Sequence, residues 1–521
     1  MSQAVLSPDG HALAFLSPTG GYDQVFVMLT SGGDPLQLTS DEGSKFLDAF
    51  AADGTQIYYG KQLGADEVWA VPTLGGTPVR VVEGGTRLWP SADGKSLFWI
   101  KVVAGEVMQS PASGGGGKGI FNFKDLGIIP IQLLAYPEGD AMLIVGTKEL
   151  NTEGTFDIYK LDLASHKLSE LGTVSGNGRK ITWGEPGKTV LLARDVNGIV
   201  NLWDYDLTKK SYTQLTSGPG PDYLPMKDPA GKGIFFVNGK NSGSLSVYHL
   251  HTKTSSDVVS DVVSQPTLSP DGKRFMYLIN PEPTRSELWV ADIDGKNKLR
   301  LASSRSIGVG DWSPDGSQVT YTQTENSPDR LFVVNADGSH SHEVPLSVAT
   351  VWSTTWSQDG NNLYVSGTKG ATRLVHTEKI AANGGDSAVA IADGCGYVTA
   401  ALDSNYLLMS SSWGERLGIF ELSVADKTCT VLVPGVTVFQ PRVSSDGRYV
   451  LYTVSSRGEV SLYRLSWHDG KAFGAPQLML KLPFAFPQST NGNAYDVARD
   501  LSNIAYVRSG GEFDLYLLSR Q

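Results

Sequence analysis

The chain has 521 residues, too many for one compact core, and its 40% hydrophobic and 19% charged residues are typical of folded proteins, so we expect two domains. Its 59 glycines and 26 prolines favour short strands joined by tight turns. The net charge of −11 argues against a nucleic-acid partner, and no apolar stretch approaches the roughly eighteen residues of a membrane-spanning helix, so we expect no membrane insertion by this chain.

The amino-terminal segment contains neither the basic nor the apolar region of a signal peptide. It leads almost at once into a repeat, and we therefore expect Met1 to begin an excised fragment.

A turn motif recurs along the chain and defines its organisation. The sequence Ser-Pro-Asp-Gly at 7–10 recurs at 269–272 and 313–316. Weaker copies keep Asp-Gly at 53–54, 93–94, 359–360 and 446–447, and degenerate copies keep only a glycine at 139, 187 and 231. Two further copies, near 403–405 and 501–503, are almost erased. Most successive turns lie 40 to 48 residues apart, so the whole chain reads as twelve units.

Each unit has the same order of short strands. In the first, an inner strand ends at Leu6, apolar strands follow at 13–16 and 25–29, and a last strand passes through 36–38. The second unit repeats this order at 57–59, 68–71 and 79–82, and the seventh at 275–277, 288–290 and 299–301. In the turn, proline presets φ, aspartate bonds nearby backbone and glycine takes the left-handed conformation. Four strands in about 43 residues predict one blade of a β-propeller.

The predicted fold is therefore all-β, with about twelve four-stranded blades. Single rings usually contain four to eight blades, which favours two six-bladed propellers over residues 1–263 and 264–521. Divisions of seven plus five or eight plus four, and one large ring, remain alternatives. The last unit ends at a third strand over 514–518, with no recognisable fourth strand.

The repeat frame resembles the TolB-type, WD-like propeller repeat. The segments 68–82 (VWAVPTLGGTPVRVV) and 25–39 (VFVMLTSGGDPLQLT) look especially like repeats that follow the kinase domain of bacterial serine/threonine protein kinases. The resemblance covers the whole chain as a frame and implies a sensory or protein-interaction module, often held outside the cytoplasm. It is specific for the fold and poorly specific for function.

The chain has two cysteines, Cys395 and Cys429, about one repeat apart. We expect unpaired thiols on neighbouring blades, because blade rims seldom bring two Cα atoms within about 7 Å of each other.

Catalytic motifs are missing from the sequence. No Gly-x-Ser-x-Gly elbow is present, and the repeats leave no room for an α/β-hydrolase domain. Histidine pairs at 249/251 and 340/342 fall toward outer strands, without an evident third metal ligand. We therefore expect no enzymatic activity, no metal and no cofactor.

Candidate ligand-binding residues come from the segments that lead into the inner strands, because loops on this face vary while the blades hold them rigid. Arginine and aromatic side chains are the types that anchor interfaces. Those found in these segments are Arg87, Trp89, Arg179, Tyr223, Trp352 and Arg442. Packing between neighbouring strands is the alternative role for the same residues.

The sequence thus predicts a non-catalytic module that binds a protein, a small molecule or an oligosaccharide. Its expected context is the periplasmic sensor region of a larger bacterial receptor, such as a serine/threonine kinase. Two alternatives remain: a propeller enzyme, either a polysaccharide lyase or a metal-dependent hydrolase with an axial site, and a TolB-like scaffold that docks a lipoprotein. The sequence does not indicate an oligomeric state.

Overall fold

The computed structural model describes the chain apart from residues 1–2, 20–21, 62–66, 102–103, 114–115, 149–154, 177–179, 262, 283–284, 325–327, 370–373, 386, 412–416, 436–437, 457–458, 469, 484–493 and 520–521. The chain forms two compact units: unit 1 comprises residues 1–240 and 512–521, and unit 2 comprises residues 241–511. The domains predicted from the repeats, 1–263 and 264–521, differ from these units in residues 241–263 and 512–521.

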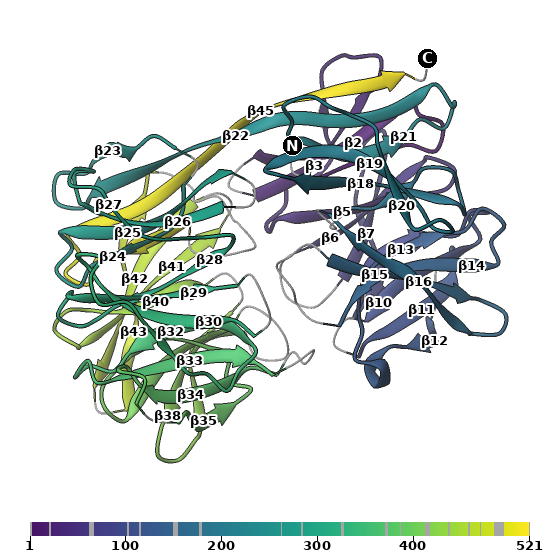
Figure 1. The fold of residues 1–521 in the computed structure, drawn as a ribbon. Coiled ribbons are helices and arrows are strands. Elements are labelled where there is room, and N and C mark those ends of the chain that lie inside the picture. The colour runs from purple at the N-terminus through teal and green to yellow at the C-terminus, as the bar shows by residue number, and fades with distance from the viewer. Residues whose placement is uncertain are drawn as a thin grey trace. The chain divides into compact units, whose positions relative to one another are not determined.

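Unit 1 contains five four-stranded antiparallel sheets, each made of consecutive strands (Figure 1). These are β1–β4 (Ala4–Leu6, Ala12–Thr19, Tyr22–Leu29, Leu36–Gln37), β5–β8 (Lys45–Phe50, Gln56–Lys61, Glu67–Pro72, Val79–Glu83), β9–β12 (Thr86–Pro90, Ser96–Lys101, Glu106–Pro111, Lys118–Asn122), β13–β16 (Ile129–Ala135, Ala141–Thr147, Thr155–Asp162, Leu168–Ser175) and β17–β20 (Thr182–Trp183, Thr189–Val196, Ile199–Asp206, Ser211–Gln214). A short 3-10 helix, η1 (Lys124–Leu126), precedes β13.

Unit 2 contains five further sheets of the same kind. These are β24–β27 (Val263–Leu268, Arg274–Glu282, Arg285–Asp292, Leu299–Ser304), β28–β31 (Ile307–Trp312, Gln318–Gln323, Arg330–Asn335, His342–Val344), β32–β35 (Thr350–Trp356, Asn362–Thr368, His376–Ala381, Val389–Asp393), β36–β39 (Tyr397–Ala401, Tyr406–Ser411, Gly418–Ser423, Cys429–Pro434) and β40–β43 (Val438–Val443, Tyr449–Ser456, Glu459–His468, Lys471–Leu482).

The remaining sheet contains two unusually long strands, β22 (Gly233–His249) and β45 (Asn503–Ser519), which run side by side in Figure 1. The sheet order is β21 (Asp222–Lys227), β22, β45 and β44 (Tyr495–Val497), and β23 (Thr254–Val259) also pairs with β22. Each long strand passes from one compact unit to the other, because the units divide at residues 240/241 and 511/512. The predicted strand over 514–518 is therefore the end of a 17-residue strand rather than a separate third strand.

The all-β propeller fold predicted from the repeats is confirmed. The expected strands at 13–16, 57–59 and 288–290 lie within β2, β6 and β26. Repeats six and twelve share one sheet, so the described residues form eleven sheets, and the count of twelve separate blades stays a prediction.

The recurring turn has the chemistry expected from its sequence. In the first copy, the Ser7 hydroxyl donates to Asp9 Oδ1 at 2.6 Å, and the same oxygen accepts the backbone N–H of His11 at 3.0 Å. Gly10 follows at φ +76°, in the left-handed region, where a side chain would be strained and would also meet Asp228 Oδ1 at 3.0 Å. A glycine is therefore required at this position of the turn.

The innermost strands of each unit form a closed ring. In unit 1 the order is β1, β5, β9, β13, β17, β21 and back to β1, and in unit 2 it is β24, β28, β32, β36, β40, β44 and back to β24. Polar side chains form hydrogen bonds between neighbouring blades near the inner strands. The Gln132 amide accepts the N–H of Ile181 at 3.0 Å and donates to its C=O at 2.7 Å.

Most inner strands contain a β-bulge near their middle. The pairing register shifts between Leu47 and Ala49 in β5, and between Val309 and Trp312 in β28. A bulge turns the local backbone and redirects a side chain that a regular strand would point elsewhere. In β5 and β28 the residues at the bulge are Asp48 and Asp311, which both belong to the sites described below.

Apolar side chains from neighbouring sheets fill the space between blades. One such cluster combines Leu143 and Ile158 of the fourth sheet with Val190 and Leu192 of the fifth, all fully buried. Tryptophans at the ends of inner strands also reach back one repeat. Trp356 Nε1 donates to the carbonyl of Asp311 at 3.1 Å, and Trp312 Nε1 donates to that of Thr267 at 3.0 Å.

The expectation of two unpaired thiols is wrong, because Cys395 and Cys429 form a disulfide with a Cα–Cα distance of 6.2 Å. Cys395 follows β35, the outer strand of one blade, and Cys429 begins β39, the outer strand of the next. The two outer strands approach closely enough at this point to be bridged.

Candidate functional site

Three charged side chains in or beside the inner strands of unit 1 interact electrostatically, and we call Asp48, Arg87 and Lys180 the unit 1 axial cluster. Lys180 precedes β17, and its Nζ donates to the carbonyl of Ala4 on β1 at 2.8 Å. Since β21 lies between β17 and β1 in the ring, this lysine extends past one inner strand to bond the next. Asp48 is buried at the β5 bulge, where Oδ2 accepts the N–H of Leu88 at 3.2 Å.

Arg87 is the exposed member of the cluster and lies on β9 with φ +60°, a strained conformation for a residue with a side chain. Burial raises the pKa of Asp48 to about 6, although the charge of Arg87 and the Leu88 N–H oppose this shift. Burial also lowers the pKa of Lys180 to about 7, opposed by Asp48 and assisted by Arg87. Two cations therefore act on one carboxylate, and in the described part of the chain none of the three forms a direct ion pair.

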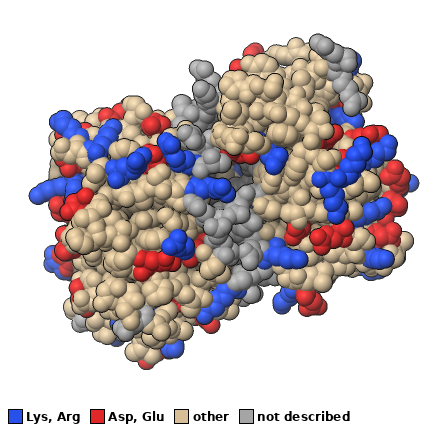
Figure 2. All heavy atoms as spheres, in the orientation of Figure 1, with Lys and Arg blue, Asp and Glu red and all other residues tan. Residues whose placement is uncertain are grey.

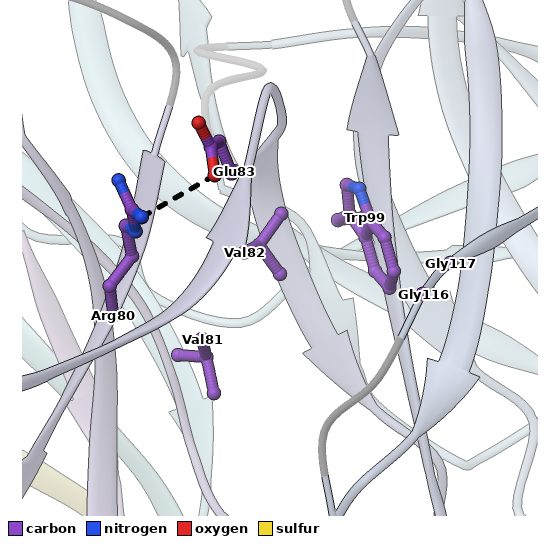
Figure 3. Close-up of a pocket in the computed structure, with 7 residues that line it drawn as sticks. All are labelled: Arg80, Val81, Val82, Glu83, Trp99, Gly116 and Gly117. Carbon is purple, nitrogen blue, oxygen red and sulfur yellow. Dashed lines mark ion pairs between the residues drawn. The ribbon is translucent and has the colours of Figure 1, made fainter.

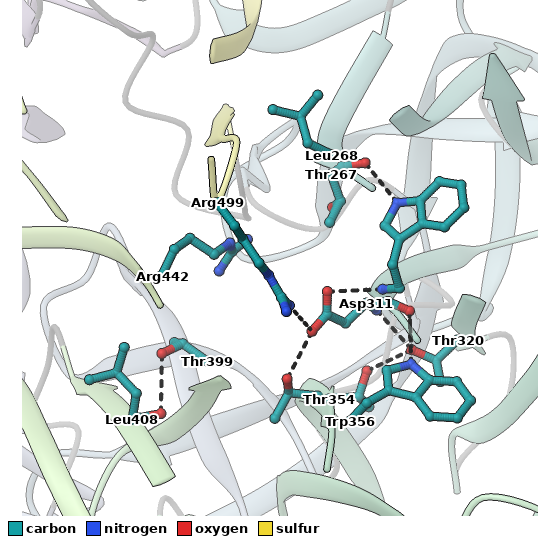
Figure 4. Close-up of polar contacts among 12 residues, drawn as sticks. Thr267, Leu268, Asp311, Thr320, Thr354, Trp356, Thr399, Leu408, Arg442 and Arg499 are labelled. Carbon is teal, nitrogen blue, oxygen red and sulfur yellow. Dashed lines mark hydrogen bonds and ion pairs between the residues drawn. The ribbon is translucent and has the colours of Figure 1, made fainter. Parts of the chain in front are cut away.

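A second polar group joins the inner strands of unit 2, and we call Asp311, Thr355, Arg442, Asp496 and Arg499 the unit 2 axial cluster. Figure 4 labels Asp311, Arg442 and Arg499. The Thr355 hydroxyl donates to Asp311 Oδ2 at 2.8 Å. Arg442 Nε donates to Asp496 Oδ1 at 2.7 Å, and Arg499 Nη2 lies 3.8 Å from Asp311 Oδ2. Each carboxylate thus has a guanidinium partner.

Most of the unit 2 cluster is buried, with Arg499 partly exposed, and its charges balance. Burial raises the pKa of Asp496, opposed by Arg442 and by the N–H of Leu268, which donates to Asp496 Oδ2 at 2.9 Å. Burial opposes ionisation of Arg442, yet Asp496 and Asp311 outweigh it and raise the pKa of the guanidinium. Two arginines balance two aspartates, so this cluster ties inner strands together.

The structure brings only some of the sequence-predicted site residues to an axis. Arg87 and Arg442 belong to the unit 1 and unit 2 axial clusters, respectively. Trp89 packs against the apolar clusters of the third to fifth sheets, and Tyr223 packs against Leu202 and its neighbours. Trp352 on β32 is 39% exposed. Arg179 lies outside the described residues.

The sequence reasoning missed Asp48 and Lys180 in unit 1, and Asp311, Asp496 and Arg499 in unit 2. A signal for part of this set exists in the repeat register. Asp311, Thr355, Arg442 and Asp496 each lie two positions before the first residue of their Ser-Pro-Asp-Gly-like turn. Aligning the repeats at that position would have placed the four side chains at one level of the ring.

A separate pocket of about 290 Å³ lies on the outer strands of unit 1, lined by residues 80–83 of β8 with Trp99, Gly116 and Gly117 (Figure 3). Arg80 is held there by Glu67 at 2.7 Å and by Glu83 at 3.4 Å. An added Cβ on Gly117 would lie 2.2 Å from the Trp99 ring, so the glycine allows the backbone to pack on the indole. None of the candidate ligand-binding residues lines this pocket.

Other features give no site of their own. Among the described residues, no three His, Cys, Asp or Glu side chains are grouped so that they could hold a metal. The one helix assigned there, η1, is far too short to cross a membrane, and no other described segment is a spanning helix. Figure 2 shows Lys and Arg interspersed with Asp and Glu over the face in view.

Residues 266–473 match the family model of the TolB β-propeller domain, PD40. This segment lies entirely within unit 2 and makes up less than half of the chain, so this part of the chain is similar to a TolB β-propeller domain. A solved structure, the putative TolB from Agrobacterium tumefaciens, is 15% identical with a TM-score of 0.41, over 52% of this chain and 99% of that one.

Curated relatives include two proteins named dipeptidyl-peptidase 5. Dipeptidyl-peptidase 5 of Trichophyton schoenleinii is 30% identical over 336 residues, which are 60% of this chain and 42% of the relative. Dipeptidyl-peptidase 5 of Trichophyton equinum is 31% identical over 151 residues, 27% of this chain and 20% of the relative. The chain thus spans less than half the length of these relatives.

Proposed function

We propose that the chain is a non-catalytic β-propeller module that binds a protein or small-molecule ligand, and that the unit 1 axial cluster is its binding site. The observation that carries this proposal is the difference in charge balance between the two axes. In unit 2, each buried aspartate has its own arginine. In unit 1, Arg87 and Lys180 share the single carboxylate of Asp48 without direct contact.

The strain stored in this cluster supports a binding role. Burial disfavours the charged forms of both Asp48 and Lys180, and Arg87 has an unfavourable backbone conformation. Charged groups that lower the stability of the folded protein are common at functional sites, because such a site must offer charge to a ligand. If these charged side chains served only for packing, apolar side chains of similar volume would give a more stable protein.

The wider context belongs to the same proposal. The repeat resemblance supports a sensor region of a larger bacterial receptor such as a serine/threonine kinase. The disulfide between Cys395 and Cys429 supports a location outside the cytoplasm, where such bonds persist.

A second candidate follows from the curated relatives. The match to dipeptidyl-peptidase 5 over 336 residues supports a role as the propeller portion of a larger peptidase-like protein. In that protein the same axial cluster would contact peptide substrates, and the reacting groups would come from elsewhere.

A ligand screen with a turnover assay tests both roles. We expect peptides, oligosaccharides or small acids to include compounds that raise the Tm of the chain, because a ligand at a hundred times its Kd adds about 2.7 kcal/mol to the free energy of unfolding. The chain alone should release no p-nitroaniline from dipeptidyl p-nitroanilides. Turnover that one substitution in this chain abolishes would contradict a non-catalytic role.

A further inference from the structure

We propose that the unit 1 axial cluster binds the carboxylate group of its ligand, held between the guanidinium of Arg87 and the ammonium of Lys180. This inference rests on the proposed binding function and adds the chemical class of the ligand.

The geometry leaves hydrogen-bond donors free at the axis. The bond to Ala4 uses one of the three ammonium protons of Lys180, so two protons can be offered to a ligand. Arg87 is exposed, and its side chain donates no hydrogen bond to the described residues. A guanidinium presents two parallel N–H groups that match the two oxygens of a carboxylate, and a nearby ammonium adds a point charge.

The charge of the cluster favours a monoanion. With Arg87 and Lys180 charged and Asp48 ionised, the cluster carries one net positive charge, which one carboxylate neutralises. A phosphate dianion would add a second negative charge close to Asp48, and like charges disfavour each other in a partly buried site. We therefore expect a carboxylate to bind more tightly than inorganic phosphate.

Lys180 also links binding to proton uptake. The groups acting on its ammonium are Asp48 from β5 and Arg87 from β9, together with the Ala4 carbonyl of β1. A bound carboxylate favours the protonated amine, so binding near pH 7.5 should take up a fraction of a proton. Affinity should fall as pH rises from 6 to 8, first as Asp48 loses its proton and then as Lys180 does.

Carboxylates of this kind occur at peptide carboxyl termini and in sugar acids, and calorimetry separates the two sources. The probes are acetyl-alanyl-alanine with its carboxy-amide, and D-glucuronate with D-glucose, each titrated into the full chain. We expect one acid to bind and its neutral counterpart to bind at least tenfold more weakly. Heats measured in phosphate-free buffers of different ionisation enthalpy should reveal the proton uptake.

Variants locate the site. Arg87→Gln and Lys180→Gln should each weaken binding about 10- to 100-fold, the usual effect of losing one charged hydrogen bond. Arg80→Gln, in the outer pocket, is the matched control and should leave binding unchanged.

Three results would overturn the assignment: equal binding of acid and neutral probe, loss of binding only in Arg80→Gln, or no binding of any acid. If neutral ligands still raise the Tm in the screen, the proposed binding function survives and only the carboxylate assignment fails. If no ligand of any class binds, both fail.

Discussion

The ammonium nitrogen of Lys180 lies 2.8 Å from the carbonyl oxygen of Ala4, although the strand β21 separates their blades around the ring. The lysine therefore bonds the inner strand beyond its neighbour, whereas Gln132 bonds Ile181 of the adjacent blade. This crossing places a cation beside Asp48 and Arg87 and makes the axis of unit 1 chemically different from that of unit 2.

Replacing Asp48 by asparagine should stabilise the protein at neutral pH. The folded state raises the pKa of Asp48 from 3.8 to about 6, so between these values it binds a proton that the unfolded chain has lost. The free energy of unfolding contributed by this group therefore falls as pH rises through that window. Asp48→Asn keeps an acceptor for Leu88 and should be about 1–3 kcal/mol more stable than the wild type at pH 8.

Urea denaturation at pH 4 and pH 8 measures this effect, and the advantage of the variant should disappear at the lower pH. Asp53→Asn is the control, because the folded state lowers the pKa of Asp53 whereas it raises that of Asp48. Hydrogen bonds from the backbone and side chain of Thr55 lower the pKa of Asp53, so this substitution should not stabilise the protein at pH 8. Equal responses of the two variants would contradict the prediction.

Arg442→Met should destabilise the protein by about 3–5 kcal/mol at pH 7, because it leaves Asp496 buried without its cation. Adding Asp496→Asn should recover much of this loss, since the uncompensated charge is then removed. Urea denaturation of the single and double variants provides the comparison. A double variant no more stable than Arg442→Met would show that packing, rather than charge, is the role of this arginine.

Reduction of the disulfide should lower the free energy of unfolding by about 3–4 kcal/mol, the value expected for closing a loop of this size, since 34 positions separate the two cysteines. Denaturation with and without reductant measures it. The Cys395→Ser, Cys429→Ser double variant should match the reduced protein and should not respond to reductant. A wild type insensitive to reductant would contradict this role of the disulfide.

Gly231→Ala should cost about 1 kcal/mol or slightly more, because Gly231 has φ +75° while no atom lies within 4 Å of an added Cβ. The cost is therefore conformational rather than steric. Gly116→Ala is the matched control, since it also has open space around an added Cβ and has no left-handed φ. Thermal unfolding of both variants should show a lower Tm for Gly231→Ala alone.

The sequence predicts most of the fold because the turn chemistry repeats. A glycine with positive φ at each Pro-Asp-Gly turn, followed by two apolar strands, defines a blade from local residues alone. The sheet that joins β22 to β45 could not be predicted in this way, because its strands are some 270 residues apart and no local pattern reports their pairing. The disulfide was missed for the same reason.

The candidate site was predicted less completely. The segments that lead into the inner strands contain Arg87 and Arg442, and residue type with this position predicts both. Asp48 and Lys180 carry no local signal, because their roles come from side chains that meet across the ring. Trp89 and Tyr223 were sought on the same basis as Arg87 but pack against apolar clusters, and residue type alone could not distinguish these two outcomes.

The long strand β45 affects the order in which the protein can fold during its synthesis on the ribosome. Its end is synthesised long after the first blade, yet Leu515 packs against the cluster that contains Leu13 and Phe15 of that blade, and Tyr516 stacks on Phe236 with ring centres 5.6 Å apart. Until β45 has been synthesised, all six inner strands of the first ring are present, but β22 lacks its neighbour in the sheet and has an unpaired strand edge. Such an edge can recruit other chains. Completion of the sixth sheet of the amino-terminal ring therefore waits for a strand that is synthesised some 270 residues after β22.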